Sequence, residues 1–262
     1  MKSIQTLSLL LFIASVNALE LKVTTSSGTT EGISKNNVII WSDIPYAQPP
    51  IGDLRWKAPR KIKSNTNFIH PKNNNFCIQR TSNLGGSSQF SDELISGTED
   101  CLYLDIYAPQ KKSKDKLPIM LWIHGGGNTS GLKDLYDFSK FVKKHNVIVV
   151  TINYRLGPLG WFTHPSIQSL QDGIDKTSNF GTLDIISALE WVNENINLFG
   201  GDSQNITIFG ESAGGHNVLS LLVSNKADGL FHKAISMSGY TESISLEDAY
   251  RPIKKSPTSN YS

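Results

Sequence analysis

Hydrophobic and polar positions follow different periods in different parts of the chain. Residues 20–45 alternate between apolar and polar side chains and are broken by glycines, which is typical of short antiparallel strands. Residues 46–100 are rich in Pro, Asn, Gly and Ser and have no strong period, so they predict a long loop-rich region. From residue 147 onward, apolar runs alternate with segments of helical period. We therefore expect an α/β fold: a mostly parallel central sheet with flanking helices, and a small N-terminal antiparallel sheet.

Two segments carry the clearest patterns. Val147–Ile152 is a continuous run rich in β-branched residues, as in a strand that is buried on both faces. Leu183–Ile196 places apolar side chains at helical spacing, for example at Ile185, Leu189 and Val192. The other expected strands are Leu102–Tyr107, Ile119–Ile123, Ile206–Phe209 and Lys233–Met237, and the other expected helices are Tyr136–Lys144 and Ala213–Val223.

The N-terminus has the pattern of an export signal. A lysine near the start is followed by the almost wholly apolar run Leu7–Val16, and small residues then precede Leu19 at positions −3 and −1. Residues 1–18 therefore predict a signal peptide cleaved after Ala18, and a secreted or periplasmic protein; a buried N-terminal strand is the alternative. The apolar run is too short to span a bilayer and no later segment is apolar enough, so we expect no membrane anchor.

Composition narrows the range of functions. The 262 residues include 39% hydrophobic and 18% charged residues, as in an ordinary globular protein, and a net charge of +2 gives no reason to expect a nucleic-acid partner. The sequence contains no metal-ligand cluster and no nucleotide-binding loop, so we expect neither a metal nor a cofactor. We expect one domain over residues 19–239. The polar residues 240–262 form either a truncated loop or a disordered end.

Cys77 and Cys101 are the two cysteines of the chain. An even number of cysteines in an exported protein favours a disulfide. Two free buried thiols are the alternative.

The strongest chemical motif is the sequence Gly-Glu-Ser-Ala-Gly at positions 210–214. It lies between the expected strand Ile206–Phe209 and the expected helix Ala213–Val223. A serine that attacks an acyl group must project from a turn too tight for flanking side chains, and glycines two residues away on each side allow this. The start of a helix also favours developing negative charge. This context predicts that Ser212 is a nucleophile.

A second motif, His124-Gly125-Gly126-Gly127, directly follows the expected strand Ile119–Ile123. The tetrahedral intermediate of acyl transfer needs N–H donors aimed at its oxyanion. A glycine run after an early strand supplies such donors, and the residue after the nucleophile completes the set. The predicted donors are the backbone N–H groups of Gly126, Gly127 and Ala213. A glycine loop without a role is the alternative.

With these motifs in place, the chain resembles the type B carboxylesterase and cholinesterase family of the α/β-hydrolase fold. The resemblance implies hydrolysis of carboxylic esters through an acyl-serine intermediate. Family members are about twice as long, so the resemblance covers their N-terminal half, and we expect the C-terminal half of the fold to be missing. The matching stretches are Gly52–Pro59, Glu99–Tyr107, Leu121–Gly127, Asn153–Phe162, Asn179–Gly215 and Leu230–Gly239.

The resemblance also assigns roles to individual residues. It gives Ser212 the role of nucleophile and implies a disulfide between Cys77 and Cys101. The remaining residues that it assigns are the oxyanion donors Gly126, Gly127 and Ala213 and the structural ion pairs Arg55–Glu99 and Arg155–Asp184.

The catalytic base is the missing part of this prediction. An α/β-hydrolase carries its serine, its acid and its histidine in that order along the chain. After Ser212 the sequence contains His216, inside the expected helix, and His232, before the strand Lys233–Met237. That strand separates His232 from the nucleophile by roughly 17–20 Å. We therefore expect a nucleophile without its base and, for this chain alone, weak activity or none.

The expected substrate is a small uncharged carboxylic ester. The segment between the two cysteines contains a single aromatic residue, Phe90. In the cholinesterases that the chain resembles, a Trp in this segment binds quaternary ammonium by a cation–π contact. The absence of such a Trp argues against a choline ester. An incomplete carboxylesterase is our first interpretation. The alternative is a secreted non-catalytic carboxylesterase-like binding module, and a lipase is a third candidate for which no lid segment is identifiable.

Overall fold

The structure is a computed structural model that describes residues 18–250 except 73–74, 84, 90–91 and 112. The predicted signal peptide up to Asn17 and the single aromatic residue Phe90 lie outside the described residues, as does the end of the polar tail.

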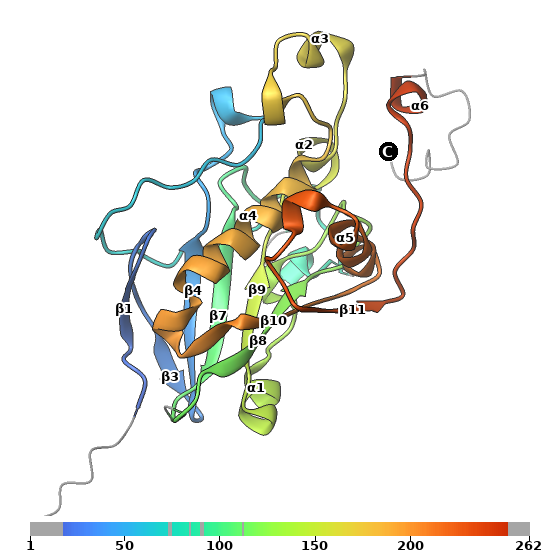
Figure 1. Cartoon of the computed structure of the whole chain (residues 1–262). Helices are drawn as coiled ribbons and strands as arrows, with labels where there is room; N and C mark the ends of the chain where they lie inside the picture. The colour runs from blue at the N-terminus through green and yellow to red at the C-terminus, as the bar shows by residue number, and fades with distance from the viewer. Residues whose placement is uncertain (1–17, 73–74, 84, 90–91, 112, 251–262) are drawn as a thin grey trace, which may run out of the picture.

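A seven-stranded sheet forms the centre of the molecule, in the order β11-β10-β8-β9-β7-β4-β3 (Figure 1). Neighbouring strands pair in parallel along β11-β10-β8-β9 and antiparallel along β9-β7-β4-β3. The predicted α/β architecture is confirmed, with a sheet of mixed direction. The strands are β3 (Ile33–Lys35), β4 (Val38–Pro45), β7 (Tyr103–Pro109), β8 (Leu117–Ile123), β9 (Ile148–Ile152), β10 (Gly201–Glu211) and β11 (Lys233–Met237).

Helices cover both faces of this sheet, which explains why its central strands are largely apolar. All residues of β9 are buried. Alternate residues of β8 pack into different cores: Ile119 and Leu121 join the core under α4 and α5, whereas Trp122 joins the smaller core under α1. The helices are α1 (Ser139–His145), α2 (Gly157–Gly160), α3 (Pro165–Gln168), α4 (Phe180–Asn195), α5 (Ala213–Leu222) and α6 (Leu246–Tyr250).

Small elements complete the fold. β1 (Lys22–Thr25) and β2 (Gly28–Glu31) form the predicted N-terminal antiparallel hairpin. β5 (Gln79–Arg80) and β6 (Ile95–Ser96) pair within the loop-rich region. The 3₁₀ helices are η1 (Gly52–Leu54), η2 (Ser87–Gln89), η3 (Lys133–Leu135), η4 (Gly173–Asp175), η5 (Ile196–Phe199) and η6 (Asn225–Ala227).

One predicted helix is shorter than its sequence pattern suggested. Helical spacing predicted a start at Tyr136, but α1 begins at Ser139, whose N–H donates to the side chain of Asp137 over 2.8 Å. Tyr136 and Phe138 instead place their rings against Trp122. Aromatic packing therefore outweighs the local helical pattern at this end.

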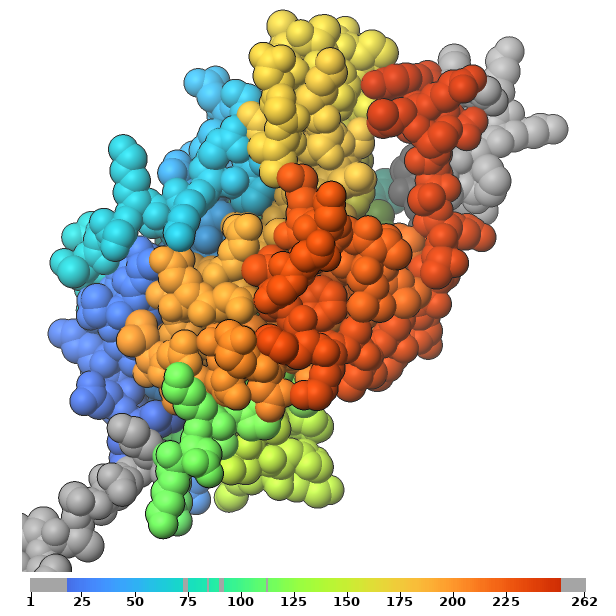
Figure 2. All heavy atoms as spheres, viewed as in Figure 1, coloured from blue at the N-terminus to red at the C-terminus, as the bar shows by residue number. Residues whose placement is uncertain are grey.

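The strand β11 forms one edge of the sheet and is poorly covered. Ile235 and Met237 remain 44% and 38% exposed, although the strands beside the centre of the sheet are buried. The exposed segment that follows, drawn in red, runs along the outside of the molecule (Figure 2). An uncovered parallel edge strand with apolar side chains favours association with another strand.

Over the described residues, no helix has both the length and the apolar composition needed to cross a membrane.

Candidate active site

Ser212 occupies a strained turn between β10 and α5. Its backbone has φ +56° and ψ −121°, a conformation that residues other than glycine rarely adopt. Its N–H donates to the carbonyl of Met237 over 2.9 Å. The glycines on either side are required by close approach. A Cβ on Gly214 would lie 2.1 Å from the carbonyl oxygen of Ile123, and one on Gly210 would lie 2.5 Å from the backbone of Gly214. The predicted strand–turn–helix geometry is present.

The turn places Ser212 at the start of a helix. Its carbonyl accepts the N–H of His216 over 3.0 Å, which closes the first turn of α5. The N–H of Ala213 belongs to the first helical turn, whose donors have no partner inside the helix. This end of α5 therefore carries partial positive charge and an available donor beside the serine hydroxyl.

The glycine loop, Gly125–Gly131, follows β8 and runs against the serine turn. A Cβ on Gly125 would lie 3.3 Å from the Cβ of Ser212, which shows how closely the two segments approach. Gly126 has φ +99°, and a Cβ there would lie 2.2 Å from the carbonyl oxygen of Ser130. Within the described part of the chain, the N–H groups of Gly126 and Gly127 have no acceptor. Two unused donors thus belong to the loop that runs against the turn of the candidate nucleophile.

His124 supports this loop as a neutral side chain. The imidazole is fully buried, and burial lowers its pKa to about 4. Its Nδ1–H donates to the carbonyl of Gly125 over 2.8 Å, and its ring stacks on Tyr154 with centroids 4.3 Å apart. The Tyr154 hydroxyl also donates to the carbonyl of His124 over 2.6 Å. His124 therefore fixes the start of the glycine loop.

Three side-chain amides hold the glycine loop, and none of them was predicted from the sequence. The Nδ2 of Asn217 in α5 donates to the Oδ1 of Asn128 over 2.9 Å. On the other side, Gln79 both accepts from the N–H of Gly131 and donates to its carbonyl, each over 2.8 Å. Their positions in the sequence could have indicated such a role, because Asn128 directly follows the glycine run and Gln79 lies two residues after Cys77.

The two histidines after Ser212 do not face it. The Nδ1–H of His216 donates to the carbonyl of Tyr240, and the two rings stack with centroids 4.4 Å apart. The Nδ1 of His232 accepts the N–H of Ile206. The strand register places His232 beside Ile206, before the stretch in which β10 and β11 pair and which ends at the serine turn. Both agree with the sequence-based expectation that neither histidine acts as the base.

A comparison with known proteins agrees with this geometry. The family model described as "Carboxylesterase family" matches residues 19–255. This chain belongs to the carboxylesterase family. Over 229 residues it is 43% identical to para-nitrobenzyl esterase of Bacillus subtilis (strain 168), an alignment that covers 87% of this chain and 45% of that protein. Over 212 residues it is 41% identical to liver carboxylesterase 1 of Oryctolagus cuniculus, covering 77% of this chain and 36% of the relative.

Solved structures agree with the same assignment. A thermophilic PNB esterase superposes with a TM-score of 0.78 at 41% identity, and the match covers 88% of this chain and 46% of that structure. The α/β-hydrolase fold of the carboxylesterases is therefore shown for this chain. The chain spans less than half the length of the relatives it matches.

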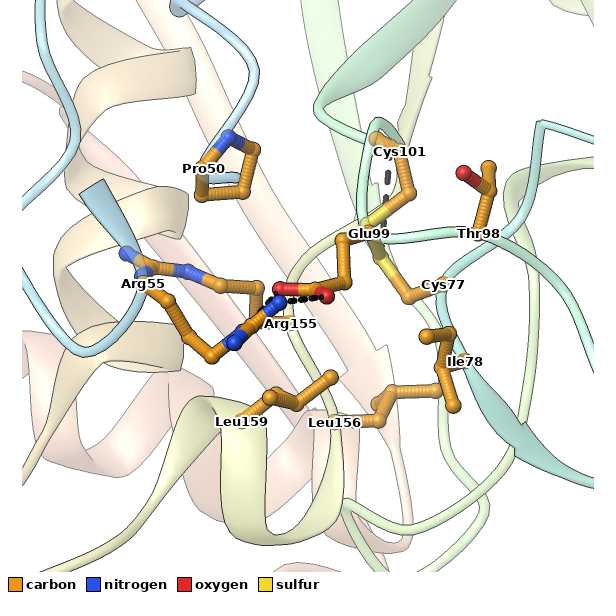
Figure 3. Close-up of a pocket in the computed structure, with 10 residues that line it drawn as sticks. All are labelled: Pro50, Arg55, Cys77, Ile78, Thr98, Glu99, Cys101, Arg155, Leu156 and Leu159. Atoms are coloured by element: carbon orange, nitrogen blue, oxygen red, sulfur yellow. Dashed lines mark hydrogen bonds and ion pairs between the residues drawn. A yellow bond between two sulfur atoms is a disulfide. The ribbon is translucent and has the colours of Figure 1, made fainter. Parts of the chain in front are cut away.

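The carboxylesterase chain contains the disulfide that the resemblance implied. Cys77 and Cys101 are bonded, with their Cα atoms 4.9 Å apart. The disulfide lies beside a small pocket that Leu156 and Leu159 also line (Figure 3). The alternative of two free thiols is thereby excluded.

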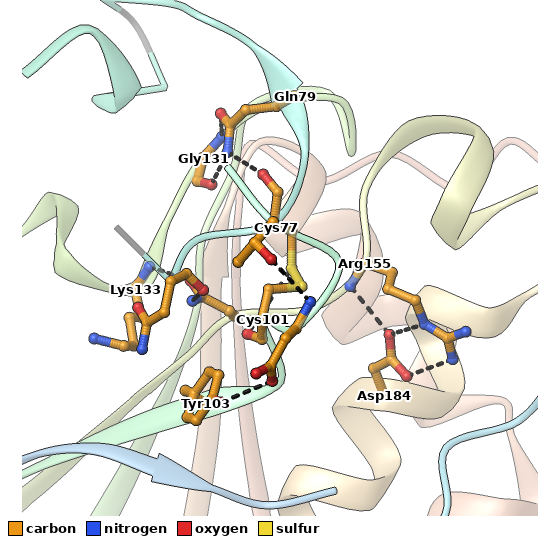
Figure 4. Close-up of a disulfide and its surroundings, with 12 residues drawn as sticks. Cys77, Gln79, Cys101, Tyr103, Gly131, Lys133, Arg155 and Asp184 are labelled. Atoms are coloured by element: carbon orange, nitrogen blue, oxygen red, sulfur yellow. Dashed lines mark hydrogen bonds and ion pairs between the residues drawn. A yellow bond between two sulfur atoms is a disulfide. The ribbon is translucent and has the colours of Figure 1, made fainter. Parts of the chain in front are cut away.

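Both expected ion pairs are formed. Arg55 contacts the carboxylate of Glu99 through two nitrogens, over 2.6 and 2.5 Å, at the partly exposed edge of that pocket. Arg155 forms the same bidentate contact with Asp184, over 2.8 and 2.7 Å, and here both side chains are buried (Figure 4). The second pair fastens the segment after β9 to α4, because the backbone N–H of Arg155 also donates to Asp184.

A buried ionic cluster that the sequence did not reveal follows the glycine loop. Lys133 is 2% exposed, and its Nζ lies 2.9 Å from a carboxylate oxygen of each of Asp43, Asp105 and Asp134. Burial raises the pKa of Asp105 to about 8, although the charge of Lys133 opposes this. The backbone N–H of Lys133 donates to Asn153 at the end of β9. The cluster therefore anchors the segment after the glycine loop to the sheet.

Proposed function

We propose that this chain carries the nucleophile and the oxyanion donors of a carboxylic ester hydrolase, and that Ser212 forms an acyl-serine intermediate. The observation that supports this most is the contact between the strained turn of Ser212 and the glycine loop with its unused donors. Membership of the carboxylesterase family supports the ester bond as the target.

In the proposed reaction, the Ser212 oxygen attacks the carbonyl carbon of the ester. The carbonyl oxygen becomes an oxyanion that accepts from the N–H groups of Gly126, Gly127 and Ala213. A base takes the serine proton and returns it to the alcohol, which leaves as the intermediate collapses to the acyl-serine. Water then releases the acid by the same steps. Donors preorganised in this way commonly account for about 10²–10³-fold in rate each.

The base is proposed to come from outside the described residues. His216 and His232 are hydrogen-bonded elsewhere, and His124 is buried against Tyr154. We propose that the acid and the histidine belong to the part of the carboxylesterase fold that this chain does not cover. The chain by itself is then a weak catalyst, because an unactivated serine keeps its proton at neutral pH.

We propose that the substrate is a small uncharged carboxylic ester and that the protein is exported. Relatives are named as a para-nitrobenzyl esterase, a cocaine esterase and a juvenile hormone esterase, which supports an ester as the substrate class. The export proposal rests on the sequence of residues 1–18.

A fluorophosphonate probe tests the role of Ser212. Residues 19–262 are incubated with excess probe, and the adduct is located by peptide mass spectrometry in the wild type, Ser212→Ala and Ser166→Ala. Ser166 is an exposed serine of α3 and serves as the matched control. We expect slow labelling of Ser212 in the wild type and Ser166→Ala, and none in Ser212→Ala. Labelling that persists in Ser212→Ala would contradict Ser212 as the reactive serine, and a wild type in which Ser212 reacts no faster than Ser166 would favour the alternative, a non-catalytic binding module.

A further inference from the structure

We propose that Asn217 is a positioning residue: through Asn128 it holds the glycine loop at a fixed distance from the helix that carries Ser212. The catalytic meaning of this inference rests on the proposed function, but the positioning itself is a property of the fold.

The two asparagines form a reciprocal amide pair. The Nδ2 of Asn217 donates to the Oδ1 of Asn128 over 2.9 Å, and the Nδ2 of Asn128 points back to the Oδ1 of Asn217 over 3.4 Å. The Tyr154 hydroxyl lies 3.4 Å from the same Asn128 oxygen. Asn217 is 2% exposed, so water does not readily replace a lost partner. The pair therefore makes a specific bridge between the loop and α5.

The Asn128–Asn217 bridge joins the two segments that carry the proposed oxyanion donors. Asn128 directly follows Gly127, and Asn217 belongs to the helix that starts with Ala213. The proposed oxyanion donors thus come from two segments that are far apart in sequence. Donors act only within about 2.7–3.1 Å of the oxyanion, so a small shift of the glycine loop removes two of the three. The amide pair links these two segments by side chains.

The backbone of Asn128 is itself well anchored. It has φ +58°, a left-handed conformation that Asn accepts more readily than most residues, and its carbonyl accepts the N–H of Gly157 over 2.7 Å. Beyond it, Gln79 holds Gly131 to the disulfide region (Figure 4). Loss of Asn217 would therefore free the loop from α5 while leaving its far end attached. The expected result is a loosened loop in a folded protein.

Hydrogen exchange measured by mass spectrometry on residues 19–262 tests this without any ester. Exchange is compared in a peptide covering residues 125–135, where the N–H groups of Thr129 and Ser130 donate to Gly126, and in a β9 peptide as reference. The variants are Asn217→Ala, Asn217→Asp and the matched control Asn195→Ala. Asn195 is an equally buried amide that bonds to Ser26, away from the loop.

We expect Asn217→Ala to speed exchange in residues 125–135 by about fivefold to tenfold relative to β9, as loss of one hydrogen bond implies. Asn195→Ala should leave that ratio unchanged. If Asn217→Ala speeds the loop no more than Asn195→Ala does, the proposal is wrong.

Asn217→Asp adds a pH-dependent readout that general destabilisation does not produce. A carboxylate cannot donate to Asn128, but a protonated carboxyl can, and burial raises the pKa of such a group above its ordinary value of about 3.9. The exchange rate of the loop in Asn217→Asp, divided by that in the wild type, should therefore be well above one at neutral pH. It should fall towards one as the pH drops through that pKa. If the ratio of loop exchange in Asn217→Asp to that in the wild type stays constant with pH, the proposal is wrong. This outcome decides the question even if Asn217→Ala fails to fold. Because no substrate is used, failure of the proposed function leaves this test intact.

Discussion

The side chain of Gln79 forms two hydrogen bonds with the backbone of Gly131, each 2.8 Å long. Gln79 lies in β5, inside the segment that the disulfide closes, and Gly131 ends the glycine loop. The disulfide segment and the candidate active site are therefore mechanically connected through one buried amide.

We predict that Gln79→Ala lowers the free energy of unfolding by about 2–4 kcal/mol, because it leaves a buried N–H and a buried carbonyl of Gly131 unpaired. Urea unfolding followed by tryptophan fluorescence measures the change. Gln48→Ala is the control, since Gln48 donates to a carbonyl at an exposed position and its loss should cost less than about 0.5 kcal/mol. Equal effects of the two substitutions would contradict the prediction.

The disulfide should contribute measurably to stability. Cys77 and Cys101 are 24 residues apart, and closing a loop of that size is worth about 3–4 kcal/mol in the chain-entropy model. Cys77→Ser/Cys101→Ser should lose stability of this order in urea unfolding. A thiol titration of denatured, unreduced wild-type protein should detect no free thiol. Two titratable thiols would contradict the assignment.

The cluster around Lys133 predicts a pH dependence of stability. Burial raises the pKa of Asp105 to about 8 in the folded protein, above the ordinary value of about 3.9 in the unfolded chain. The folded state therefore binds this proton more tightly, so the stabilising contribution is complete below about pH 4 and is lost as the pH rises towards 8. Asp105→Asn should flatten the decline of the unfolding free energy between pH 5 and 8, measured by urea unfolding at each pH. An unchanged slope would show that Asp105 does not titrate in this range.

The edge strand β11 predicts self-association. Ile235 and Met237 expose apolar surface along an unpaired parallel edge, where another strand can pair. Ile235→Lys/Met237→Lys should reduce concentration-dependent association in sedimentation velocity experiments. Ile174→Lys, at a similarly exposed isoleucine outside the sheet, is the control and should have no effect. A wild-type chain that stays monomeric at high concentration would contradict the prediction.

The fold could be predicted from sequence wherever the pattern was local. The strand Lys233–Met237 has the predicted bounds. Val147–Ile152 corresponds to β9, because a continuous apolar run there reports burial on both faces. The start of α1 was misplaced because Tyr136 packs on Trp122, a contact that no local period reveals.

The candidate site was only partly accessible to sequence reasoning for the same reason. The turn of Ser212 and the glycine loop are contiguous motifs whose glycines report tight backbone geometry. The Asn128–Asn217 pair joins residues 89 positions apart, and two of the three partners of Lys133, Asp43 and Asp105, come from distant strands. Pairings over such distances depend on the sheet order, which the pattern of apolar residues did not specify.

The most direct test of the central claim is the rate at which residues 19–262 hydrolyse p-nitrophenyl acetate, compared with Ser212→Ala and with para-nitrobenzyl esterase of Bacillus subtilis. Without a base, the oxyanion donors and binding leave at most about 10³–10⁴-fold catalysis over water. We predict a rate at or below that level and far under that of the full-length relative, with only a small further loss in Ser212→Ala, because this residual catalysis does not need the serine. Turnover near that of the relative, abolished by Ser212→Ala, would contradict the absence of a base from the described residues.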